Sequence, residues 1–121
     1  VAAAYAAPYD ISGEAVGSLN LNDEIWHFKA VRACTISATA SDHQAGCVTA
    51  PTGSPCVMTF YKNTTANTIG TVSYAASTGT ATFTGFVSNT SIAKGDLVFC
   101  KITSLTNPIG NPYWTLLATV A

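Results

Sequence analysis

The sequence predicts an all-β fold, an antiparallel β-sandwich of jelly-roll character with about seven or eight strands. In several short runs, bulky apolar residues alternate with small or polar ones, which places every second side chain on one face of a strand. Clusters of Gly, Pro, Asn and Ser separate these runs at intervals of about eight to twelve residues, a spacing typical of sandwiches. The residues that share the inward parity are Trp26, Phe28, Ala30, Cys34 and Ile36, then Met58 and Phe60, then Val98, Cys100 and Ile102, then Trp114, Leu116, Ala118 and Val120.

The first half of the chain is expected to hold a short first strand or arm near Tyr9–Ile11, one long strand and one long loop. The long strand, Glu24–Thr39, exceeds the usual strand length, so a bulge or a change of sheet is expected near Arg32–Cys34. The segment Ala40–Pro55 has no periodicity and is rich in Ser, Gly, Pro and Thr. It is predicted to be a loop, and a long loop in a compact domain often carries function or is held by a disulfide.

The second half is expected to consist of short strands joined by turns. Gly95 can adopt a positive φ and Asp96 can accept hydrogen bonds from nearby amides, so the segment SIAKGD is predicted to be a structural turn. The expected strands are Cys56–Lys62, Thr68–Ala75, Thr80–Val87, Leu97–Thr103 and Tyr113–Val120, and the other turns are Asn63–Asn67, Ser77–Gly79 and the segment NPIGNP.

The length of 121 residues fits one domain. Residues 11–121 are assigned to the sandwich. Residues 1–10 are rich in alanine and include Pro8, and they are expected to form an arm or linker that becomes ordered against a neighbour.

Composition narrows the function classes. Charged residues make up 9% of the chain, against roughly 25% in an ordinary soluble domain, and the formal net charge is -1. With five Lys and Arg and no basic stripe, no nucleic-acid partner is expected. Membrane insertion is not expected either, because no apolar stretch approaches the roughly 20 residues that cross a bilayer. A surface so poor in charge suits a protein held in an assembly or exposed outside cells.

The order of three segments carries a family resemblance. The segments IWHFKAVRACTI, MTFYKNTTANTIGTVSYAASTGTATFTGF and SIAKGDLVFCKIT together resemble the β-sandwich domains of bacteriophage tail-fibre and other virion-appendage proteins. The resemblance spans Ile25–Thr103 and rests on turn and core features, whereas the four cysteines and the expanded Asn63–Asn67 turn depart from the pattern.

The resemblance implies a non-enzymatic structural protein on the exterior of a phage virion, such as a tail-fibre, decoration or other appendage subunit. Other virion proteins would be its partners, and contact with a host-surface glycan during host attachment is also implied. A homotrimer is the favoured assembly, since exposed apolar strands on a charge-poor surface would otherwise promote aggregation.

Other function classes stay open. Two sequons could accept glycans in a secreted or cell-surface protein, so that location stays open: Asn63-Thr64-Thr65 and Asn89-Thr90-Ser91. An extracellular adhesin-like domain would have obligatory disulfides. A carbohydrate-binding module would stack sugar rings on aromatic side chains, for which the candidates are Tyr61, Tyr74, Tyr113 and Trp114.

The four cysteines allow three pairings. A bridge between Cys47 and Cys56 would hold the long loop, and it is the favoured pair; a bridge between Cys34 and Cys100 would join two inward positions of different strands. Free buried thiols are the alternative for Cys34 and Cys100. Zinc is not expected, because the smallest gap has eight residues between the cysteines, wider than common zinc motifs use.

No catalytic residue, cofactor or metal ligand is predicted, and the chain is not expected to be an enzyme. Asp42-His43 and the many serines supply residue types of a hydrolase triad, but no nucleophile-elbow pattern surrounds any serine. The carboxylates are scattered singly or lie at turns. A receptor site, if present, is expected in the Ala40–Pro55 loop and the Asn63–Asn67 turn, with His43, Gln44, Asn63, Asn67 and Tyr61 as the candidate contacts.

Overall fold

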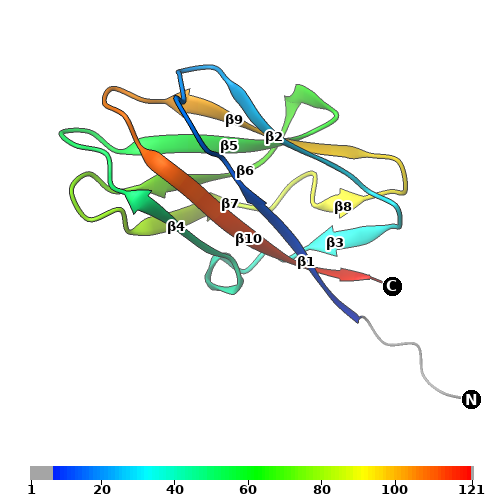
Figure 1. Cartoon of the computed structure of the whole chain (residues 1–121). Helices are drawn as coiled ribbons and strands as arrows, with labels where there is room; N and C mark the ends of the chain where they lie inside the picture. The colour runs from blue at the N-terminus through cyan, green and yellow to red at the C-terminus, as the bar shows by residue number, and fades with distance from the viewer. Residues whose placement is uncertain (1–6, 121) are drawn as a thin grey trace, which may run out of the picture.

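The computed structural model describes residues 7–120, which form two antiparallel β-sheets packed face to face (Figure 1). The described elements are β1 (Ala7–Glu14), β2 (Glu24–Lys29), β3 (Cys34–Ile36), the short 3₁₀ helix η1 (Ala40–Asp42), β4 (Gln44–Thr49), β5 (Cys56–Lys62), β6 (Thr64–Tyr74), β7 (Ala81–Gly85), β8 (Ser91–Ile92), β9 (Leu97–Ser104) and β10 (Gly110–Val120). The sandwich prediction is confirmed, with ten strands in the described residues instead of seven or eight.

We name the two layers sheet A and sheet B. Sheet A has the order β1-β10-β3-β8, and β4 pairs with β10 on the same side as β3. Sheet B has the order β2-β9-β5-β6-β7. The chain crosses repeatedly between the layers, and its first and last described strands pair with each other, as in a jelly roll.

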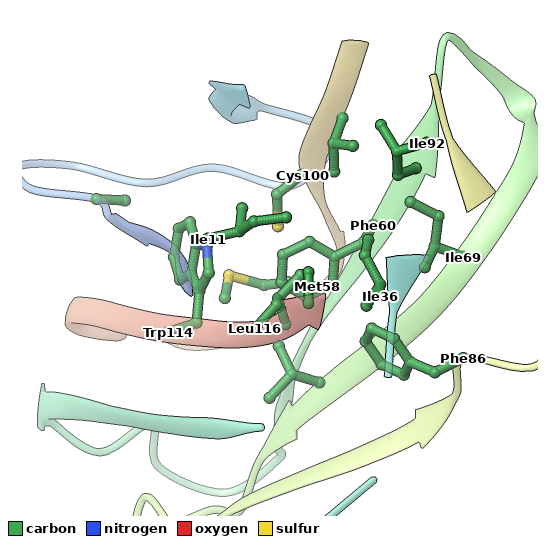
Figure 2. Close-up of a cluster of buried hydrophobic side chains, with 14 of the residues drawn as sticks. Ile11, Ile36, Met58, Phe60, Ile69, Phe86, Ile92, Cys100, Trp114 and Leu116 are labelled. Carbon is green, nitrogen blue, oxygen red and sulfur yellow. The ribbon is translucent and has the colours of Figure 1, made fainter. Parts of the chain in front are cut away.

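The predicted inward parity is confirmed. Trp114, Leu116 and Ala118 of β10 are buried against Met58, Phe60, Cys100 and Ile102 of sheet B, as Figure 2 shows for several of them. Trp26 and Phe28 are partly buried against this core. The Trp26 and Trp114 rings meet edge to face with centroids 5.7 Å apart, a favoured aromatic geometry. Gly13 makes room for them, since a Cβ there would lie 2.5 Å from Trp26 Nε1.

The expected change of sheet is also confirmed. β2 lies in sheet B and β3 in sheet A, so the predicted long strand is divided by residues 30–33. Ala30 anchors the crossing, because its amide donates to the Asp96 carbonyl (2.9 Å) and its carbonyl accepts from the Gly95 amide (2.8 Å).

Several boundaries differ from the prediction. β8 lies inside the predicted SIAKGD turn because Ser91 and Ile92 pair with β3, and β10 begins inside the predicted NPIGNP turn because Gly110 and Pro112 pair with β4. The segment Ala40–Pro55 contains η1 and β4, so it is not one loop. Asn63 alone makes the predicted Asn63–Asn67 turn, since β6 already begins at Thr64. Residues 7–10 of the expected arm belong to β1 and pair with β10, whereas its residues 1–6 lie outside the described part.

The pairing of β1 with β10 defines the two ends of the sandwich. Ala7 lies opposite Val120, so the described chain enters and leaves at one end, which we call the terminal end (Figure 1). Connections 15–23, 50–55, 75–80 and 105–109 gather at the other, distal end. There the Ser77 amide donates to the Pro51 carbonyl (2.7 Å), and the Asn107 side chain donates to the Thr52 carbonyl.

Candidate functional site

His43 closes a gap in sheet A. β4 pairs with β10 up to Thr115, and β3 pairs with β10 from Ala118, so the backbone of Leu117 has neither strand beside it. The Leu117 amide instead donates to His43 Nδ1 (3.0 Å), and the Leu117 carbonyl accepts from the Ser37 amide (2.9 Å). His43 Nε2 donates to the Ser37 carbonyl (2.9 Å). These bonds require the neutral ring with its proton on Nε2.

The surroundings of His43 suit a neutral ring. The side chain is only 3% exposed and packs on Phe83 and Phe86, with ring centroids 5.3 Å and 4.6 Å away. Burial lowers the pKa of His43 below its usual value, while the hydrogen bond to Ser37 and the charge of Asp42 act in the opposite direction. His43 was predicted to touch a receptor; its buried position and its two bonds give it a structural role instead.

Asn63 and Asp96 lock two turns together at the terminal end. The Asn63 amide group donates to Asp96 Oδ1 (3.1 Å), and its oxygen accepts from the Leu97 amide (2.9 Å). Asp96 Oδ2 accepts from the Ala93 amide (2.9 Å), which closes the predicted Lys-Gly-Asp turn. The hydrogen bonds from Ala93 and then Asn63 lower the pKa of Asp96. The Asn63 side chain is therefore committed to the fold.

The remaining predicted contacts divide between the two sheets. Tyr61 is 9% exposed and packs against Phe99 with ring centroids 5.3 Å apart. The Asn67 side chain donates to the Lys62 carbonyl (3.1 Å). Gln44 is exposed and lies directly opposite Thr115 on the outer face of sheet A. Of the five predicted contact residues, His43 and Gln44 line one recess of about 360 Å³ formed by η1, β4 and β7, whereas Tyr61, Asn63 and Asn67 are not among its lining residues.

All four cysteines are free thiols in the structure, so neither predicted bridge is formed. Burial, with a smaller effect of the nearby Cys47, raises the pKa of Cys56 to about 11. Burial also raises the pKa of Cys34, Cys47 and Cys100. Thiols with raised pKa values are weakly nucleophilic near neutral pH.

An exposed aromatic ring stands on the outer face of sheet A. Tyr113 is 49% exposed and lies opposite Gly46 of β4 on one side and Glu14 of β1 on the other. Its side chain leans over Gly46, where a Cβ would lie only 2.5 Å from the Tyr113 hydroxyl. The Tyr113 carbonyl accepts a hydrogen bond from the buried Tyr74 hydroxyl (3.0 Å), which fixes the backbone beneath the ring.

A recess of about 380 Å³ is lined by residues of β1 and β10, including Tyr113, and we call it the Tyr113 recess. The Trp114 side chain is buried in the core, and a Cβ on Gly13 would point toward Trp26 and Trp114, so both residues line the recess with backbone. The hydroxyls of Ser12 and Thr115 lie 3.1 Å apart in the next row of the sheet. The lining residues are Ser12, Gly13, Glu14, Tyr113, Trp114 and Thr115.

Tyr113 is a sugar-stacking candidate from the sequence, with Asn and Asp side chains as the expected hydrogen-bond partners, but the polar residues beside it in the structure are Ser12, Glu14 and Thr115. Ser12 and Glu14 lie about a hundred residues from Thr115 and Tyr113, and only the β1–β10 register brings them together. The available signal was the outward parity of β10, which places Tyr113 and Thr115 on the face opposite Trp114.

Residues 7–120 contain no group of three or more His, Cys, Asp or Glu that could hold a metal ion. Over the same residues there is no helix long and apolar enough to cross a membrane. Comparisons of the chain with protein-family models, with curated proteins and with solved structures found no match.

Proposed function

We propose that this chain is a non-enzymatic structural domain of a bacteriophage virion appendage, a tail-fibre or decoration subunit exposed on the particle. The observation that carries the proposal is the pairing of Ala7 with Val120. Because both described ends of the chain emerge at the terminal end, a domain attached there to a particle projects its distal loops and both outer sheet faces.

The residues behind the family resemblance support the same proposal, since they contact one another in the structure. Asn63 of the Lys-Asn strand end bonds Asp96 of the Lys-Gly-Asp turn. Gly70 of the Ile-Gly-Thr motif lies against the ring of Phe86, at the end of the threonine-rich strand. These motifs thus make contacts between sheet B and its connections.

The experiment that tests the proposal is the native mass of the purified chain by light scattering, with and without reductant. We expect a trimer whose mass and fold do not change on reduction, because the thiols are free. A monomer that unfolds on reduction would overturn the proposal and favour a disulfide-dependent secreted module.

A second function, carbohydrate binding, is favoured by the position of one aromatic ring. Of the four aromatic candidates, Tyr74 and Trp114 are buried in the core and Tyr61 is 9% exposed, whereas Tyr113 is 49% exposed. Aromatic rings with one open face are the usual platform for sugars. A glycan array probed with the labelled chain tests this function, and an array without any bound glycan would count against it.

A further inference from the structure

We propose that the Tyr113 recess binds a single neutral hexopyranose ring of a surface glycan. The inference deepens the carbohydrate-binding function above and rests on it.

Tyr113 supplies the stacking platform. The C–H face of a pyranose is apolar and packs on an aromatic ring, provided that the ring is held still and one of its faces is open. Gly46 meets the first condition because it gives the Tyr113 ring a surface to lie on, and any side chain at position 46 would displace it. The 49% exposure of Tyr113 meets the second.

The β1 side of the recess supplies hydrogen-bonding groups for the edge of the sugar. Glu14 lies directly across the sheet from Tyr113, so its carboxylate can accept from two neighbouring sugar hydroxyls. In the next row, the hydroxyls of Ser12 and Thr115 bond each other, which leaves one proton and free lone pairs for the ligand. Gln44 extends this row on the far side of Thr115.

The charge of the recess selects the class of sugar. Glu14 is the charged residue among the lining residues, and no Lys or Arg is among them. A carboxylated sugar such as a sialic acid would face like-charge repulsion from Glu14, whereas a neutral hexose offers it hydroxyl protons. The recess volume of about 380 Å³ lies at the lower end of the range for small-molecule sites, which suits one ring.

The experiment is a titration of the ¹⁵N-labelled chain, followed by amide chemical shifts, with methyl glycosides of glucose, galactose and mannose and, separately, with N-acetylneuraminic acid. We expect at least one neutral glycoside to shift the amides of Gly13, Glu14, Gly46 and Tyr113, and no shift with the acidic sugar. The absence of shifts at these amides with every neutral glycoside would overturn the proposal.

Single substitutions test which side chains contact the sugar. Tyr113→Ala should weaken binding about tenfold or more, and Tyr113→Phe by about twofold, because the platform is kept. Glu14→Gln should weaken neutral-sugar binding several-fold and reduce the discrimination against N-acetylneuraminic acid. Val87→Ala is the matched control, since Val87 is exposed and outside the recess. Unchanged affinity in both Tyr113→Ala and Glu14→Gln would refute the site.

The outcomes separate this inference from the proposed function. Glycan binding that survives Tyr113→Ala would refute the recess and leave carbohydrate binding standing. An empty glycan array with a stable trimer would refute both the recess and carbohydrate binding, while the virion proposal would stand. If Tyr113→Ala changes the native mass and not sugar binding, the recess is a contact between copies of the chain and the proposal fails.

Discussion

Acid should destabilise the fold through His43. In the unfolded chain His43 titrates near its ordinary pKa of 6.5, and in the folded chain burial lowers that pKa. Below 6.5 the unfolded state therefore binds more protons than the folded state, so the free energy of unfolding falls as the pH falls. Well above 6.5 the two states bind the same number of protons at His43, and the effect vanishes. The loss of unfolding free energy stops growing once the pH is below the pKa of His43 in the folded chain.

The size of the effect follows from one proton. Within the window below 6.5, each pH unit should remove up to about 1.4 kcal/mol of unfolding free energy. The structural reason is that a protonated Nδ1 would point its hydrogen at the Leu117 amide, which now donates to it. Against a typical domain stability of about 5–15 kcal/mol, this loss is readily measured.

The assay is urea unfolding followed by tryptophan fluorescence at intervals between about pH 5 and pH 7.5, the range in which histidine titrates. His43→Phe keeps an aromatic ring in place but removes both hydrogen bonds, so it should cost about 1–3 kcal/mol at neutral pH. It should also flatten the pH dependence. His27→Gln is the control. His27 is exposed and pairs with Glu24 of the same strand, β2, which lies in sheet B and not in sheet A. The slope of unfolding free energy against pH should disappear in His43→Phe and persist in His27→Gln. The opposite result in either variant would refute the reasoning.

Three further predictions test the core, the turns and the thiols. In the native protein near neutral pH, iodoacetamide should modify Cys47 before the three buried cysteines, as read from intact mass; a chain with no reactive thiol even when unfolded without reductant would instead show bridges. Gly70→Ala should lower the unfolding free energy by about 1–3 kcal/mol, because the added Cβ would overlap the Phe86 ring; equal urea midpoints would contradict this. Asn63→Gly should cost about 1–2 kcal/mol through its lost hydrogen bond to Asp96. Asn63→Ala should cost about 1 kcal/mol more, since Asn63 has a φ of 64°, and equal losses would show that this backbone strain is small.

The fold could be predicted for strands that bury one face, because apolar residues then alternate with polar ones in the sequence. In β9 and β10 the inward residues recur at every second position, so both strands and their orientation followed from the sequence. β4 could not be found in this way, because the segment QAGCVT has no such alternation. Its pairing depends on β10 and on the Tyr113 ring above Gly46, and both are distant in the sequence.

The role of His43 was not predictable for a similar reason. In the sequence, His43 lies within the polar segment Ser41–Gln44, and such segments usually face solvent. The ring is buried because the gap between β3 and β4 leaves the Leu117 amide 74 residues away in need of an acceptor. Local sequence carries no sign of that gap.

Several polar side chains of the loops form hydrogen bonds within the protein itself, and this favours a binding surface on a sheet. Asn63, Asn89 and Asn107 all donate to backbone or side-chain oxygens of other segments, and Asp96 accepts from two turns. Such bonds stabilise connections that contain few apolar residues. A ligand at these loops would have to break them. On the outer face of sheet A, by contrast, the strands already satisfy the backbone, so Glu14, Tyr113 and the hydroxyl pair beside them can meet a ligand without a loss of folding contacts. Binding at the Tyr113 recess should therefore leave the structure of the chain unchanged.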